Sequence, residues 1–169
     1  MIELTAEQTT ATEELTLEAL VQNMRAVLDF VSGKLEQYDC SPVARMTVET
    51  AVEELFLNIA NYAYSPGTGA VTVRVETVRE PLSIAITFMD GGVPYNPLAM
   101  EDADPDLIAE NRSIGGFGIF MVKSTMDAVT YEDKNGQNVL VIRKNLNDTL
   151  ERWTEGDTEP ADEALADEG

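Results

Sequence analysis

The stretch "AVTYEDKNGQNVLVIRK", residues 128 to 144, constrains the fold most strongly, because it predicts two strands joined by a two-residue turn. Asn135 and Gly136 are residue types that accept the positive φ angles of a hairpin turn. Residues 70 to 78 and 82 to 90 repeat the strand pattern on either side of a short charged turn. Two hairpins of this kind predict a mostly antiparallel sheet.

Helical patterns occupy much of the remaining chain. Apolar residues spaced three and four apart predict a first helix from about residue 16 to 35. Ser41 and Pro42 suit the N-cap and first residue of a second helix, which should run to about residue 64. A third apolar helix follows the glycines at the start of "GGFGIFMVKSTMD", residues 115 to 127. This order predicts an α+β fold: a two-layer α/β sandwich whose mixed, mostly antiparallel sheet carries the helices on one face.

The net charge of the chain limits the kinds of partner that it can bind. Thirty-one acidic residues against eleven basic ones give a formal charge of −20, which repels nucleic-acid phosphates and anionic lipid surfaces. We therefore expect no direct nucleic-acid partner and no membrane association. Residues 151 to 169 hold eight of the acids and one base. This predicts a domain over residues 1 to 146 and an acidic, disordered tail over 147 to 169.

Two residue types limit the chemistry and the compartment. The chain has no histidine, which excludes Ser-His-Asp triads, Cys-His proteases, histidine-ligated metals and phosphohistidine intermediates. Any reaction must use carboxylates, amides, hydroxyls, lysine or a bound ion. The lone Cys40 and the absence of a targeting pattern predict a reducing, cytoplasmic location.

A narrow polar stripe follows the second predicted helix. At 100° per residue its members fall within about 40° of one line, on a helix that is otherwise largely apolar. The stripe is either a solvated face or the wall of a pocket, and its amides and hydroxyls are more typical of a pocket than of a solvated face. The stripe consists of Thr47, Thr50, Glu54, Asn58 and Asn61.

Glu54 and Asn58 are one helical turn apart, so their Cβ atoms lie about 5 to 6 Å from each other. An amide oxygen suits a hard ion such as Mg²⁺, which keeps several waters and takes few protein ligands beside substrate phosphates. The neighbouring carboxylate is a candidate base toward a hydroxyl or water that attacks a phosphate. Glu53 projects about 100° away and is expected on the surface.

Two glycine-containing turns are further candidates. "FMDGGVP", residues 88 to 94, ends an apolar strand with Asp90 as an acceptor, and Gly92 admits close approach of a ligand. "GGFG", residues 115 to 118, offers backbone amides to an anion at a helix N-terminus. Each is ordinary turn chemistry when taken alone. The proline-containing segment between them is long for a connection and is typical of a lid or binding loop.

Taken in order, "EELFLN", "DGGVP" and "GGFGIFMVKSTMD" resemble the nucleotide-binding boxes of the Bergerat-fold ATPases. Gyrase, histidine kinases and the anti-sigma-factor serine/threonine kinases share these boxes. The likeness is closest to the free-standing anti-sigma-factor kinases and covers residues 1 to 146. The chain lacks a phosphoacceptor histidine, which disfavours a histidine kinase.

The resemblance implies an ATP site with Mg²⁺. Asn58 would bind the metal, Glu54 would activate the attacking hydroxyl, and Asp90 would accept a hydrogen bond from the adenine amino group. Residues 97 to 114 would form the ATP lid. The nucleotide-binding positions implied in this way are Asn58, Asn61, Asp90, Gly92, Gly115, Gly116, Phe117, Gly118 and Asn138.

The chain also departs from that family. Tyr62 stands where relatives often carry histidine or lysine, and Ile114 replaces a basic residue before the glycine turn. Asn138 stands where a threonine often supports the adenine-binding carboxylate, and an amide can still form that hydrogen bond.

Three functions follow as hypotheses. The first is an Mg-ATP-dependent serine/threonine kinase that phosphorylates an anti-anti-sigma partner, of the sulfate-transporter and anti-sigma antagonist type, and sequesters a sigma factor. The second is an ATP-gated protein-binding switch without phosphotransfer, and the third is an interaction domain without a nucleotide. Relatives often form homodimers, for which the exposed sheet face or the first helix offers a surface.

Overall fold

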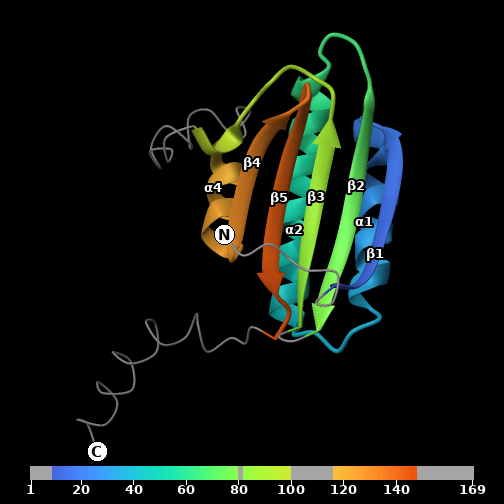
Figure 1. The fold of residues 1–169 in the computed structure, drawn as a ribbon, viewed down its shortest axis with the longest axis vertical. Coiled ribbons are helices and arrows are strands. Elements are labelled where there is room, and N and C mark those ends of the chain that lie inside the picture. The colour runs from blue at the N-terminus through green and yellow to red at the C-terminus, as the bar shows by residue number, and fades with distance from the viewer. Residues whose placement is uncertain (1–8, 80–81, 100–115, 148–169) are drawn as a thin grey trace, which may run out of the picture.

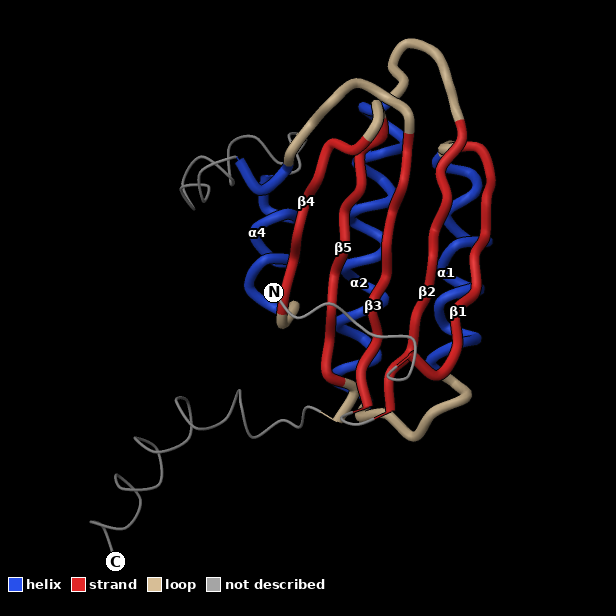
Figure 2. Tube along the Cα trace, viewed as in Figure 1, coloured by secondary structure: helices blue, strands red, loops and turns tan. Residues whose placement is uncertain are grey.

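The computed structural model describes residues 9–79, 82–99 and 116–147. Its five strands form one sheet in the order β1-β2-β3-β5-β4, with helices packed behind it (Figures 1 and 2). All four neighbouring strand pairs in the described part are antiparallel, so no parallel pair makes this sheet mixed. The strands are β1 (Thr9–Glu18), β2 (Ala70–Arg79), β3 (Leu82–Asp90), β4 (Ala128–Lys134) and β5 (Gln137–Asn145).

The helices begin and end close to where the sequence places them. The Ser41 hydroxyl accepts a hydrogen bond from the Ala44 amide at 3.1 Å, so Ser41 caps α2 and Pro42 is its first residue, as predicted. Helical structure continues beyond α2 as a π-helical turn, η2. The helical segments are η1 (Val21–Asn23), α1 (Met24–Leu35), α2 (Pro42–Asn58), η2 (Ile59–Ala63), η3 (Pro97–Ala99) and α4 (Gly116–Thr125).

The first helix begins later than predicted. Residues 16 to 18 belong to β1 and pair with residues 70 to 72 of β2, and the helix α1 begins only at Met24. Leu15 and Leu17 pack against the core while Thr16 between them is exposed, which is a period of two. Leu17 therefore belongs to a strand pattern, and its spacing to the later apolar residues only imitates a helix.

Both predicted hairpins are confirmed. Asn135 and Gly136 have φ angles of 54° and 79°, the positive values that their turn requires. The core lies between the sheet and the helices, where Val52 and Phe56 of α2 pack with Ile86 and Phe88 of β3. Within the described residues, no helix is both long and apolar enough to cross a membrane.

Candidate functional site

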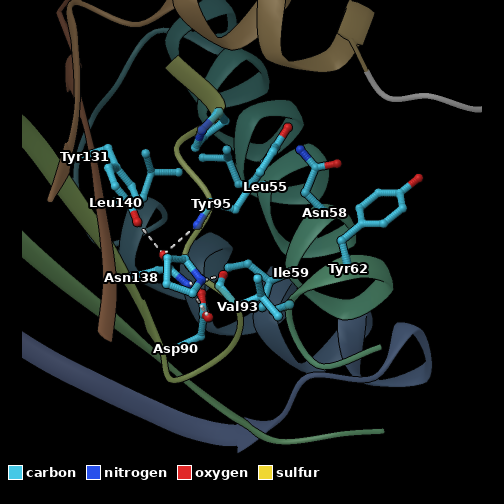
Figure 3. Close-up of a pocket in the computed structure, with 13 residues that line it drawn as sticks. Leu55, Asn58, Ile59, Tyr62, Asp90, Val93, Tyr95, Tyr131, Asn138 and Leu140 are labelled. Carbon is cyan, nitrogen blue, oxygen red and sulfur yellow. Dashed lines mark hydrogen bonds between the residues drawn. The ribbon is translucent and has the colours of Figure 1, made fainter. Parts of the chain in front are cut away.

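A pocket of about 210 Å³ lies where α2 and η2 meet the ends of β3 and β5. The segment that follows β3 forms another of its walls. Figure 3 shows the Asp90 and Asn138 side chains together, with Asn58 and Tyr62 extending from the helix away from them. The pocket is lined by Leu55, Asn58, Ile59, Tyr62, Ala63, Asp90, Val93, Pro94, Tyr95, Pro97, Tyr131, Asn138 and Leu140.

Asp90, the last residue of β3, places a carboxylate in this mostly apolar pocket. Its side chain is only 4% exposed. Oδ1 accepts hydrogen bonds from the Gly92 amide at 2.9 Å and from Asn138 Nδ2 at 3.0 Å. No described residue donates a hydrogen bond to Oδ2. The carboxylate is therefore held through one oxygen and retains acceptor capacity on the other.

Asn138 connects Asp90 to the rest of the pocket. Its Nδ2 group donates to Asp90 and, at 3.0 Å, to the Val93 carbonyl. Its Oδ1 accepts from the Tyr95 amide at 3.1 Å and from the Tyr131 hydroxyl. Both N–H groups and the oxygen are thus engaged within the protein. Asn138 orients Asp90, as the sequence predicted for an amide at this position, and has no N–H group left for a ligand.

Gly92 is required by the protein's own backbone. A Cβ at this position would lie 2.3 Å from the Ala63 carbonyl oxygen, which accepts a hydrogen bond from the Val93 amide at 2.8 Å. The sequence interpretation gave this space to a ligand. In the structure the carbonyl of η2 occupies it, so Gly92 lets the turn after Asp90 pack against the helix.

Tyr64 fixes the same turn from the other side and was missed in the sequence. Its hydroxyl accepts a hydrogen bond from the Gly91 amide at 2.7 Å and donates to the Ala70 carbonyl at 2.5 Å. A Cβ on Gly69 would lie 2.3 Å from the Tyr64 ring. Gly91 belongs to a turn that the sequence indicated, but nothing local indicated that a tyrosine packs against it.

Asn58 and Glu54 lie at the boundary between two hollows. Asn58 lines the pocket beside Asp90, and its side chain forms no hydrogen bond to a described residue. Glu54, one turn earlier, lines a groove of about 420 Å³ between α2 and α4. A Cβ on Gly118 would lie 2.0 Å from Glu54 Oε2, so the carboxylate rests against the first turn of α4.

Burial raises the pKa of the Glu54 carboxyl, and the negative charge of Glu53 raises that pKa further. Glu53 is exposed, as predicted from its position on the helix. A raised pKa suits a carboxylate that has to take up a proton during a reaction.

The predicted polar stripe is divided by the structure. Glu54 and two threonines line the groove, Asn58 lines the pocket, and Asn61 is exposed and lines neither. The Thr47 hydroxyl donates to the Val43 carbonyl at 2.7 Å, so its donor is used within the helix. Of the stripe, only Asn58 therefore lines the pocket, while Thr47, Thr50 and Glu54 line the separate groove and Asn61 is a solvated residue.

The glycine turn and the lid are described only in part. Gly116 begins α4 and Gly118 is buried against Glu54, whereas Gly115 lies outside the described residues and the Phe117 side chain is not described. Of the lid, Pro97 is buried and lines the pocket. Residues 100 to 114 lie outside the described part, so the remainder of the lid stays a prediction.

Aromatic and aliphatic side chains supply most of the pocket's surface, and of these only Tyr62 was identifiable as a site position in the sequence. Burial raises the pKa of both the Tyr95 and Tyr131 phenols, so both stay neutral at physiological pH. Tyr131 of β4 and Leu140 of β5 lie directly opposite each other. This pairing follows from the register of the Asn-Gly hairpin. A pocket of this size and polarity suits a flat ring with a hydrogen-bond donor aimed at Asp90.

Comparison with known protein families agrees with the geometry of this pocket. The family model described as "Histidine kinase-like ATPase domain" matches residues 17–144, which include Glu54, Asn58, Asp90 and Asn138. The chain belongs to the histidine kinase-like ATPase domain family. The positions that the sequence predicted for the ring, the metal and the phosphates therefore lie within the matched residues.

Known proteins with similar sequences and folds agree with this histidine kinase-like ATPase assignment. The chain is 27% identical to the serine/threonine-protein kinase BtrW of Bordetella bronchiseptica over 83% of this chain and 89% of that protein. The structure of the RsbU and RsbW domains of Rv1364c from Mycobacterium tuberculosis matches with a TM-score of 0.59 at 13% identity. That match covers 83% of this chain and 34% of the longer one, and it confirms the Bergerat-type α+β fold.

Proposed function

We propose that this chain is an Mg-ATP-dependent serine/threonine protein kinase of the anti-sigma-factor type. The observation that carries the proposal is a buried Asp90 carboxylate in an apolar pocket, next to Asn58 and Glu54 on one helix. This combination would supply an acceptor for a ring amino group, a metal ligand and a base. The 27% identity to a serine/threonine-protein kinase supports the same class of reaction.

The pocket is suited to the base of the nucleotide rather than to the whole molecule. Its volume of about 210 Å³ is below the roughly 300 to 1,000 Å³ of pockets that enclose drug-sized ligands. Asp90 Oδ2 would accept the adenine amino group, while Asn138 holds Oδ1 in place. The phosphates would then lie outside the pocket, toward the N-terminus of α4, where the Gly116 and Gly118 amides are candidate donors.

Asn58 fits the role of a magnesium ligand. Its side chain lines the pocket without a hydrogen bond to another described residue, and amide oxygen is a ligand type that Mg²⁺ accepts. The described residues contain no group of three or more acidic or cysteine side chains arranged around a common ion position. One amide beside phosphate oxygens and waters matches the sparse protein coordination typical of Mg-ATP. Bound magnesium would neutralise negative charge on the phosphates during transfer.

Glu54 would act as the base. A serine or threonine hydroxyl oxygen would form a bond to the γ-phosphorus, and the bond from that phosphorus to the bridging oxygen of ADP would break. The hydroxyl proton would pass to Glu54, whose raised pKa favours its uptake. Positioning by the groove and the pocket would contribute the rest of the acceleration.

The proposed acceptor is an anti-anti-sigma protein of the sulfate-transporter and anti-sigma antagonist type, and the proposed regulatory target is a sigma factor. Because sigma factors act on transcription, this proposal places the protein in the cytoplasm. A homodimer is part of the same proposal. These partners are proposed from the resemblance of the nucleotide-binding boxes to those of the anti-sigma-factor kinases, and the family match over residues 17–144 includes all of these boxes.

Replacement of Glu54 tests the kinase proposal. Glu54→Gln removes the base with little change in volume, and Glu53→Gln removes an exposed neighbouring charge. We expect Glu54→Gln to slow transfer of labelled phosphate from Mg-ATP to the cognate antagonist protein by about 10² to 10⁴-fold. Glu53→Gln should stay within a few-fold of the wild type. Transfer at the wild-type rate in Glu54→Gln would refute the assignment of Glu54 as base.

An ATP-gated binding switch is the second candidate. It is favoured by the contact between Glu54 and Gly118, which packs the carboxylate against α4, and by Tyr62 at a position where relatives often have a basic residue. The switch predicts that partner binding depends on the bound nucleotide and persists in Glu54→Gln. The kinase predicts that phosphate appears on a partner serine or threonine.

A further inference from the structure

The groove between α2 and α4 has no role in nucleotide binding under the proposed function. It occupies about 420 Å³ and is largely apolar. The Thr47 and Thr125 hydroxyls that line it donate to the Val43 and Met121 carbonyls of their own helices, each at 2.7 Å. These donors are therefore already engaged, and the groove offers an incoming group mainly carbon surface.

The groove adjoins the candidate catalytic residues. It lies along the N-terminal part of α2, whereas the pocket for the ring lies at the C-terminal end of the same helix. Glu54 is the one ionisable side chain among the described residues that line the groove, and Asn58 is one turn farther along. A molecule seated in the groove would thus reach the phosphate region from the side opposite the ring.

The groove continues onto a wider surface. A second, shallower hollow of about 360 Å³ between α1 and α2 shares Met46 and Thr50 with it. Met46 is 65% exposed and stands between the two hollows. An exposed, flexible methionine between two hollows is more typical of a surface that binds a macromolecule than of a site that encloses a small molecule.

The part of this surface formed by the α1–α2 hollow has an acidic rim, since Glu49 and Glu53 line that hollow together with Arg45. The Arg45 guanidinium donates to Glu36 at 3.0 Å and to Glu49 at 2.9 Å, so its positive charge is already paired. Glu53 is exposed beside Glu54 on the same helix. A segment that carries lysine or arginine would be attracted to this rim, and an acidic segment would be repelled.

We propose that the α2–α4 groove docks the phosphoacceptor protein by receiving an apolar side chain next to its serine or threonine, with basic residues on either side. The inference rests on the proposed function, because Glu54 at the end of the groove is the base for that hydroxyl. It adds a specificity site to the reaction. The occupant is a partner protein segment with an apolar, basic character.

Methionine methyl groups provide a direct test. The protein is labelled with carbon-13 at its methionine methyl groups, and the Met46 and Met121 signals are assigned by substitution. Short synthetic peptides with a serine between lysines, which differ only in leucine or aspartate beside the serine, are titrated with and without a non-hydrolysable ATP analogue. Thr50→Trp fills the groove, and Thr12→Trp makes the same change at an exposed position on β1.

We expect the leucine peptide to shift both methyl signals saturably and to bind about tenfold more tightly than the aspartate peptide, since it buries apolar surface at an acidic rim. Thr50→Trp should abolish these shifts and Thr12→Trp should keep them. The proposal is overturned if neither methyl responds to the leucine peptide, if both peptides bind equally, or if Thr50→Trp binds normally.

Failure of the docking site and failure of the proposed function give different results. Peptide binding without any binding of the ATP analogue would retain the groove and reject the kinase. Nucleotide binding and Glu54-dependent transfer without a response at Met46 and Met121 would retain the kinase and reject the groove.

Discussion

The Asp90 carboxylate and the Asn138 amide are directly opposed on β3 and β5, and Asn138 Nδ2 donates to Asp90 Oδ1 over 3.0 Å. The pair joins residues that are 48 positions apart. Asn138 in turn holds the segment after β3 through Val93 and Tyr95. Strand register thus determines the direction in which the buried acceptor faces the pocket.

Loss of the Asn138 amide should weaken the fold as well as the site. Asn138→Leu leaves buried polar groups of Asp90, Val93 and Tyr131 without their partner, so the free energy of unfolding should fall by about 3 kcal/mol. Urea denaturation measures the change. Gln137→Leu, at the exposed neighbouring position, is the control and should change it by about 0.5 kcal/mol or less. Equal effects of the two substitutions would contradict the central position of Asn138.

Alanine at the two adjacent glycines should have different effects. Gly92→Ala places a methyl group against the Ala63 carbonyl, a backbone atom that cannot move cheaply, and should cost about 2 kcal/mol of stability. Gly91→Ala meets only the Tyr64 hydroxyl at 3.7 Å, an ordinary contact. Thermal unfolding of both variants measures the difference. An unimpaired Gly92→Ala variant would show that the turn does not pack against η2 as described.

Gly118→Ala should affect the reaction more than the fold. The new methyl group would displace the Glu54 carboxylate, which is the mobile end of a side chain, so the helix can accept it. Phosphate transfer should fall by about 10 to 100-fold because a catalytic group is misplaced. The control is Gly33→Ala in α1. A Cβ at Gly33 would meet no other atom within 4 Å, so this substitution should stabilise the protein by about 0.5 to 1 kcal/mol. A single-turnover assay measures phosphate transfer by both variants. Equal rates for Gly118→Ala and Gly33→Ala would contradict the catalytic role of Glu54 beside Gly118.

The raised pKa of Glu54 has a consequence for stability. Because its pKa is higher in the folded state than in the unfolded state, ionised Glu54 destabilises the folded protein above that pKa. This penalty shrinks as the pH falls and vanishes below the ordinary pKa of 4.5, where the carboxyl is neutral in both states. Glu54→Gln should therefore be more stable than the wild type at pH 7, by a margin that decreases toward pH 5. Urea unfolding measures this stability difference at pH 7 and at pH 5. An equal difference at both pH values would contradict the raised pKa of Glu54.

Local patterns predicted much of the architecture. The Asn135-Gly136 turn, the Ser41 cap and the helix after the glycines are encoded by neighbouring residues, and each is confirmed. The start of α1 was misjudged because Leu17 satisfies both a strand period and a helix spacing. Only the pairing of β1 with β2, which is not local, selects the strand.

The candidate site was predicted by residue type more successfully than by contact. Glu54, Asn58 and Asp90 were identifiable as polar groups in apolar elements. The roles of Gly92 and Tyr64 were not identifiable, because each depends on a neighbour from another part of the chain. Sequence periodicity indicates which face of an element is polar, but it does not show what lies opposite.

Calorimetric titration with ATP, with and without Mg²⁺, measures whether the pocket at Asp90 binds a nucleotide. It is carried out on the wild type, Asp90→Asn and Asn58→Ala. We expect the wild type to bind ATP, Asp90→Asn to lose this binding, and binding to Asn58→Ala to be independent of magnesium. Absence of ATP binding to the wild type at millimolar concentration, or full binding by Asp90→Asn, would contradict the assignment of this pocket as a nucleotide site.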